Sequence, residues 1–230
     1  MPPRRLAAGL LAAAVTLALA LPLFGIGPRV AAASCSEWTS EEQPPTTIRV
    51  FRHESGAVDT VRFRRYAKNV LSREWVPSWT QVSLRAGAMA VKHYAWFHVL
   101  HWRGGANPDG ECYDVRDDVI DQVYDPSKPI YDSARRAVDA TWTVRILRDG
   151  AIFPTYYTSG TVDEECGANA NGRRMYQWGT QACGLAGKTM RQTLRTYYYP
   201  GIRIVRPPPP SPTPSPSQSP PPTPSATPPG

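Results

Sequence analysis

Glu74 is the residue whose position most clearly suggests chemistry, because it ends an otherwise apolar helical pattern. The spacing i, i+3, i+4, i+7, i+8 and i+11 predicts an amphipathic helix, which Pro77 would end. Its positions are Phe63, Tyr66, Ala67, Val70, Leu71 and Glu74. A carboxylate on an apolar face is partly desolvated, which raises its pKa and suits it to general acid catalysis. The pattern leaves open a second interpretation, in which Glu74 turns outward or pairs with Arg73 or Arg85.

Histidines and acidic residues elsewhere do not follow metal-binding patterns. The spacings of His93, His98 and His101 do not place all three on one helix face, so each is more typical of a core or rim position. An acidic loop lacks the regular order of calcium ligands; it contains Asp114, Asp117, Asp118, Asp121 and Asp125. The sequence has no Gly-x-Ser-x-Gly elbow, P-loop or dinucleotide fingerprint. We therefore expect no metal and no cofactor.

The N-terminus has the features of an export signal. Arg4 and Arg5 precede an apolar run over residues 6–24, and three alanines at 31–33 offer a cleavage site before Ser34. We expect residues 1–33 to be a signal peptide and the mature protein to be secreted, with membrane contact only before cleavage. Two alternatives are an uncleaved anchor and a lipoprotein attached at Cys35, but Ala32 and the alanine triplet suit ordinary cleavage better.

Secretion favours disulfides among the four cysteines. Cys35, Cys112, Cys166 and Cys183 lack CxxC spacing, so a zinc site is disfavoured, and three pairings are open. We predict a Cys166–Cys183 bond because it closes a short loop around a glycine-rich stretch. The pairing of Cys35 and Cys112 stays open.

The amino-acid composition distinguishes one globular domain from the two terminal segments of the chain. Of the 25 prolines, 13 fall in residues 207–230, which carry no charge and no aromatic residue and are expected to be a disordered tail. Residues 34–46 form a leader before a single domain at 47–206. The net charge is +7, and about +4 without the three arginines of the signal peptide. The lysines and arginines of the chain are scattered among 19 acidic residues, which argues against nucleic-acid binding. The positive net charge favours attraction to an anionic surface such as a bacterial wall.

Periodicity and turn residues predict the first half of the domain as a hairpin followed by helices. Two β-prone runs, 47–51 and 58–63, flank Glu54-Ser55-Gly56. A long alanine-rich helix over residues 79–102 would begin at a capping box of Ser78 and Gln81. Residues 107–129 are expected to form a long loop.

The second half mixes helices and strands. Asp132 would cap a third helix ending at Trp142, and Asp149-Gly150 predicts a hairpin between residues 143–147 and 152–157. A glycine-rich loop over 160–179 precedes a helix at 189–198 and a strand at 202–205. The fold class is α+β, with a central long helix and shorter helices packed with antiparallel β-hairpins.

Ordered motifs resemble the stage II sporulation protein D and LytB amidase-enhancer (SpoIID/LytB) family of bacterial cell-wall proteins. Residues 66–79 (YAKNVLSREWVPSW) are similar to its Y-V-K-x-V-L-x-x-E-x-x-x-x-W block, and 84–95 (LRAGAMAVKHYA) to its L-K-A-Q-A-V-A-A-R-T-Y-A helix. Further similar segments are DQVY at 121–124, residues 137–141 with Asp149-Gly150, YTSG at 157–160, NGRRMYQWG at 171–179, Gly187-Lys188 and residues 198–201. The resemblance covers roughly residues 47–205.

The resemblance implies binding to peptidoglycan glycan strands and a glutamate acid/base that matches Glu74. Members of the sporulation branch are lytic transglycosylases, whereas members of the other branch only enhance a partner amidase, so both functions remain open. We expect Trp75, Ser159, Gln177 and Trp178 to bind substrate. The chain departs from the pattern with Gly87 for Gln, Asn171 for His, Arg174 for Gly and Tyr176 for Ser. Val119, Ile120 and Asp121 replace the family's Cys/His zinc cluster, so no zinc is predicted.

Overall fold

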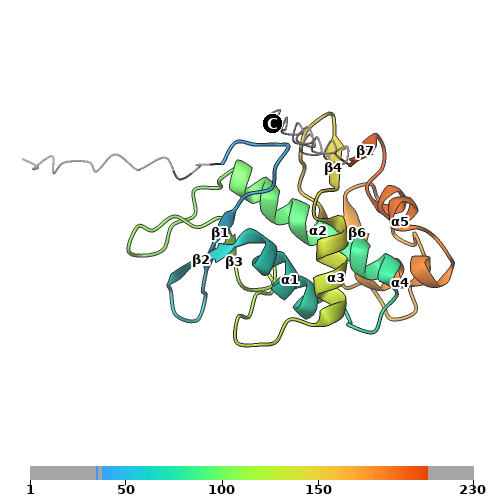
Figure 1. Cartoon of the computed structure of the whole chain (residues 1–230), viewed down its shortest axis with the longest axis horizontal. Coiled ribbons are helices and arrows are strands. Elements are labelled where there is room, and N and C mark those ends of the chain that lie inside the picture. Colours follow the sequence, from blue (N-terminus) through green and yellow to red (C-terminus); the bar gives the residue numbers. More distant parts are fainter. Residues whose placement is uncertain (1–34, 36–37, 207–230) are drawn as a thin grey trace, which may run out of the picture. The chain divides into compact units, whose positions relative to one another are not determined.

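The computed structural model describes Cys35 and residues 38–206, which form a mixed body of helices and small sheets (Figure 1). The predicted α+β class is confirmed. The signal peptide and the proline-rich tail lie outside the described residues. Among the helices of the described part, none combines the length and apolar character needed to cross a bilayer.

The predicted N-terminal hairpin is present and carries an additional strand. Strands β1 (Thr47–Phe51) and β2 (Val58–Arg62) pair antiparallel, with Thr47 opposite Arg62. β3 (Val115–Arg116) adds to the other side of β1 in parallel. β3 lies in the segment that the sequence predicted to be a loop. It was not predicted because a two-residue strand is too short to show an alternation of apolar and polar residues.

Helix α2 (Gln81–Leu100) is the centre of the fold and contacts α1 (Phe63–Glu74), α3 (Asp132–Thr141) and both later helices (Figure 1). Its alanines are buried and allow this close packing. The predicted capping box of Ser78 and Gln81 is wrong. Thr80 is the N-cap, and its hydroxyl accepts a hydrogen bond from the Ser83 backbone N–H at 3.2 Å.

The third helix begins with Asp132 inside its first turn, so the prediction that Asp132 caps it is also wrong. Tyr131 occupies the cap position and makes no side-chain cap hydrogen bond.

The C-terminal end of α3 is held by Lys92, which is buried on α2. Its Nζ donates to the carbonyls of Thr141, Trp142 and Val144 at 2.6–2.9 Å. Burial lowers the pKa of Lys92 to about 7, and its amino group donates to carbonyls at and just beyond the helix end.

The Asp149-Gly150 turn is present, but the hairpin predicted around it is wrong. Both residues have positive φ, as a tight turn requires, yet only Arg148 and Ala151 form a bridge across it. Pro154 lacks an N–H and interrupts any longer ladder. Instead β4 (Arg145–Arg148) pairs antiparallel with β7 (Ile202–Val205), and β5 (Tyr156–Thr158) pairs parallel with β6 (Arg174–Tyr176).

The segment predicted as a glycine-rich loop ends in regular structure. It contains β6 and the start of α4 (Gln177–Leu185). Helix α5 (Met190–Tyr197) follows, with a capping box between Thr189 and Gln192. Cys166 and Cys183 form the predicted disulfide, which ties the loop to α4. A second disulfide joins Cys35 to Cys112.

Candidate active site

Glu74 is the last residue of α1, and its half-buried carboxylate is held by two segments distant in sequence. Oε1 accepts a hydrogen bond from the Val123 backbone N–H at 2.9 Å. Oε2 accepts one from the side-chain amide of Gln177 at 3.2 Å. The outward orientation, or a pairing with Arg73 or Arg85, is therefore not what the structure shows. The carboxylate is fixed in place by neutral donors.

The environment of Glu74 favours its protonated form. Burial raises the pKa of Glu74 above its usual value, and hydrogen bonds from Val123, Gln177 and Tyr157 oppose this effect without cancelling it. A carboxyl group with a raised pKa retains its proton closer to neutral pH, which a general acid requires.

Gln122 is buried, and its hydrogen bonds fix the loop that contains Val123, whose backbone N–H binds the Glu74 carboxylate. Its Oε1 accepts from the Tyr66 hydroxyl at 3.0 Å, and its Nε2 donates to the Val91 carbonyl at 3.2 Å and to the Tyr157 hydroxyl at 3.1 Å. Every polar atom of the amide is used, which fixes the orientation of Gln122 and of the peptide that follows it. Gln122 and Tyr157 were not predicted as site residues, although the DQVY and YTSG segments that contain them were recognised as motifs.

Gln177 and Trp178 begin α4, and a backbone hydrogen bond brings Ser159 next to them. The Trp178 backbone N–H donates to the Ser159 carbonyl at 3.1 Å, so the hydrogen bond from Gln177 to Glu74 also links Ser159 to the carboxylate region. The half-buried rings of Trp178 and Trp79 meet edge to face with centroids 4.7 Å apart. Ser159 is exposed. Gln177 is only 7% exposed, and the substrate contacts expected of Ser159, Gln177 and Trp178 stay predictions.

The expectation that Trp75 binds substrate is not supported. Its side chain is only 2% exposed, and Nε1 donates to Thr180 Oγ1 at 3.3 Å. The indole also packs edge-on against Tyr157 with centroids 5.0 Å apart. A ring enclosed in this way offers no face to a sugar, so Trp75 is a core residue that positions Tyr157.

The helical histidines have core or rim positions. His93 is fully buried; its Nδ1 lies 2.7 Å from the Met89 carbonyl, and its Nε2 accepts from the Ile146 backbone N–H at 2.9 Å. Burial lowers its pKa well below the usual value, so the ring is neutral. His98 is also buried, whereas His101 is exposed.

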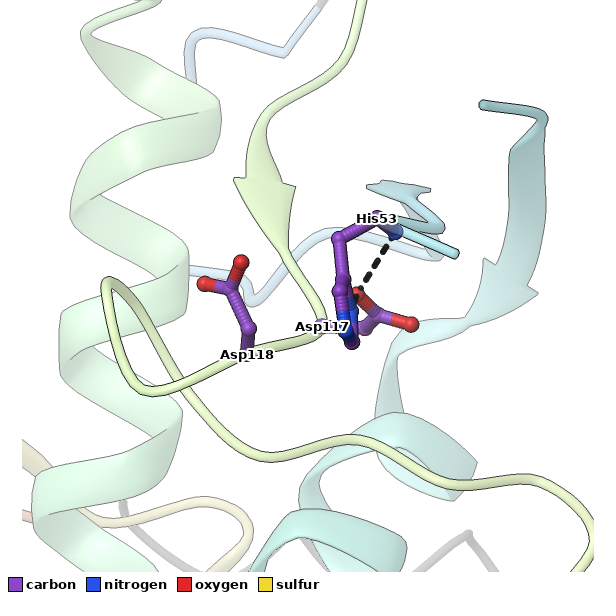
Figure 2. Close-up of side chains that lie close together, drawn as sticks. All are labelled: His53, Asp117 and Asp118. Atoms are coloured by element: carbon purple, nitrogen blue, oxygen red, sulfur yellow. Dashed lines mark hydrogen bonds and ion pairs between the residues drawn. The ribbon is translucent and has the colours of Figure 1, made fainter. Parts of the chain in front are cut away.

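His53, Asp117 and Asp118 form a group whose ligand atoms lie within 4.8 Å of one another, close enough to hold a metal ion (Figure 2). Their charges are already paired. His53 Nδ1 lies 2.7 Å from Asp117, whose other oxygen accepts from Arg52 at 2.7 Å, and Asp118 pairs with Arg116 at 2.8 Å. Two guanidinium groups beside the carboxylates disfavour a cation. The group joins the β1–β2 turn to the segment after β3.

Comparison with known proteins found a family match over part of the chain. Residues 52–147 match the family described as SpoIID, stage II sporulation protein. A protein of Brachyspira hyodysenteriae described as uncharacterized is 29% identical over 102 residues, which are 44% of this chain. These residues are 26% of that relative, so the chain spans about a quarter of its length.

This match supports the resemblance to the SpoIID family over residues 52–147. This family indicates a role related to the cell wall and sporulation. The matched range contains Glu74 and the Gln122–Val123 peptide. Ser159, Gln177 and Trp178 lie beyond it.

Proposed function

We propose that this protein is a secreted peptidoglycan-remodelling enzyme that cleaves glycan strands as a lytic transglycosylase, with Glu74 as its acid/base. The observation that carries the proposal is the carboxyl group of Glu74, half-buried, with a raised pKa and held by neutral donors from two distant segments. The resemblance to the SpoIID family, matched over residues 52–147, supports peptidoglycan as the substrate.

One carboxyl group is sufficient for this reaction. Glu74 donates its proton to the glycosidic oxygen, and the bond from that oxygen to C1 of muramic acid breaks. The C6 hydroxyl of the same sugar then bonds to C1 and gives its proton back to the Glu74 carboxylate. The product is a 1,6-anhydro sugar, and no water or second carboxylate takes part. Gln177 and Tyr157 would orient the carboxyl group between the two steps.

The disulfides support the part of the proposal that concerns secretion. Both disulfides suit an oxidising compartment. The bond to Cys112 also occupies the Cys35 thiol that a lipid anchor would need, which favours release after signal-peptide cleavage over a lipoprotein.

A second function is a non-catalytic, peptidoglycan-binding enhancer of a cell-wall amidase. It is favoured by one observation, the hydrogen bonds on both oxygens of Glu74, which are equally typical of a structural carboxylate.

Digestion of purified glycan strands decides between the two functions. We expect the wild-type protein to release anhydro-sugars, detected by mass spectrometry, and Glu74→Gln to release them at least about a hundredfold more slowly. Retained binding and an unchanged circular dichroism spectrum would show that the variant is folded. Equal rates would make Glu74 structural. A wild-type protein that cleaves no glycan but accelerates a purified amidase would establish the enhancer.

A further inference from the structure

A cavity of about 350 Å³ lies next to the Glu74 site and shares Tyr157 with it. The hydroxyl of Tyr157 is fixed by Gln122 and reaches Glu74, while the residue also lines the cavity. A group bound in the cavity would therefore be separated from the carboxyl group by one side chain.

The cavity is walled by rings and apolar side chains. Tyr94 and Tyr156 line it, with ring centroids 5.8 Å apart, and Tyr156 is 44% exposed. Val119 and Ile120 form its lip and are 88% and 65% exposed. Tyrosine faces suit the apolar faces of sugar rings, and exposed aliphatic side chains suit methyl groups.

Its charge comes from Arg174. The other charged lining residue, Asp121, has a side chain that is 0% exposed and pairs with Arg103 at 2.7 Å. Asp121 also accepts from the Tyr94 hydroxyl at 2.6 Å and from the Arg116 backbone N–H at 2.8 Å, so its charge is satisfied. Arg174 is exposed on β6, and its guanidinium has no ion-pair partner among residues 38–206.

A site with aromatic walls, an apolar lip and one unpaired guanidinium matches a sugar that carries both methyl groups and a carboxylate. We propose that this cavity is a subsite for the muramic acid of a glycan strand, in which Arg174 binds the lactyl carboxylate. The proposal rests on the proposed function, since it names the part of the substrate that this site recognises. A guanidinium binds a carboxylate through two parallel hydrogen bonds, which gives direction as well as affinity.

This subsite would set the register of the strand. Muramic acid and N-acetylglucosamine alternate along the glycan, and only muramic acid has the carboxylate. A cation at one fixed distance from Glu74 thus selects which of the two kinds of glycosidic bond lies beside the carboxyl group. The arginine stands where the family pattern has glycine, so the specificity belongs to this chain.

Binding measured by calorimetry in a Glu74→Gln background, which prevents turnover, tests the proposal. The ligands are peptide-free glycan oligosaccharides with free lactyl carboxylates and the same oligosaccharides after conversion of these carboxylates to methylamides. We expect Arg174→Gln to weaken binding of the acidic ligand about tenfold and to leave the amidated ligand within twofold. Arg174→Lys should restore part of the loss. Arg173→Gln, an exposed neighbour on the chain, should change neither affinity.

Equal affinities of Arg174→Gln and its parent for the acidic ligand, or an equal loss for both ligands, would overturn the subsite. If the wild-type protein still cleaves glycan in that case, the proposed function stands. Absence of binding to either ligand by the parent protein would instead overturn the proposed function, and the subsite with it.

Discussion

The indole ring of Trp75 fills the space beside Gly87 that a side chain would otherwise occupy. A Cβ built at Gly87 would come within 2.5 Å of the indole Cε2 atom. The glycine that departs from the family pattern on α2 is thus matched by a tryptophan next to Glu74. Trp75 is the C-cap residue of α1, so this contact lies at the end of the helix that carries Glu74.

Gly87→Ala should destabilise the protein by about 1–3 kcal/mol, because the added methyl group overpacks a buried contact. The change is measured as the free energy of unfolding in urea. Trp75→Phe gives the smaller ring that should accommodate alanine, so the double variant should lose less than the sum of the two single variants. Additive losses would show that the two residues do not compete for the same space.

Glu74→Gln should change how stability depends on pH. The pKa of Glu74 is raised in the folded state, so the folded protein holds this proton more tightly than the unfolded chain. Its contribution to stability is then fully present below the unfolded pKa, near 4.5, and is lost as the pH rises through the folded pKa.

Urea unfolding of the two proteins at pH 4 and pH 7 checks this. Glutamine does not titrate, so the variant should gain stability relative to wild type as the pH rises. A constant difference between the two proteins would contradict a raised pKa.

Gln122→Leu should change the stability of the protein and the pKa of Glu74, although Gln122 makes no hydrogen bond to Glu74. The variant removes the acceptor of the buried Tyr66 hydroxyl and one of the two partners of the Tyr157 hydroxyl, which costs about 1–3 kcal/mol. It also frees the peptide that presents the Val123 N–H, so the pKa of Glu74, followed by NMR, should rise further. Gln81→Leu, at an exposed position on α2, is the control and should leave both quantities unchanged.

Lys92→Met should be strongly destabilising although methionine fits a core. The carbonyls of Trp142 and Val144 would lose the hydrogen bond that Lys92 donates, and the Thr141 carbonyl would keep only the bond from the Val144 N–H. We therefore expect a loss of at least about 2 kcal/mol. Thermal unfolding measures it, with the exposed Lys128→Met as control. A melting temperature equal to that of wild type would mean that other groups satisfy these carbonyls.

The parts of the fold that depend on local pattern could be predicted from sequence. The hairpin at Gly56, the helix ending at Glu74 and the strand at 202–205 follow from turn residues and periodicity. The pairing of β5 with β6 could not be predicted, because parallel partners are brought together by tertiary packing and leave no turn between them. The start of α4 was missed for a related reason: glycines at 179 and 184 resemble a loop, but the space there is taken by Tyr197 and Thr80.

In the candidate site, too, residues marked by a local pattern were predicted and residues placed by tertiary contacts were not. Glu74 stands out because a charge interrupts an apolar stripe, and Gln177 was found through a family motif. Trp75 was misassigned since an aromatic residue beside a catalytic candidate has the same appearance in sequence whether it faces solvent or the core. Gln122 acts through hydrogen bonds to three distant residues, which no local spacing reveals.

The Cys35–Cys112 bond also determines how the domain would respond to mechanical load. It closes a covalent loop that contains β1, β2, α1 and α2. A force that pulls Cys35 away from the C-terminal part of the domain would pass through the sulfur atoms to residue 112 and bypass these elements. The central helix and Glu74 are thus shielded from extension under such a force.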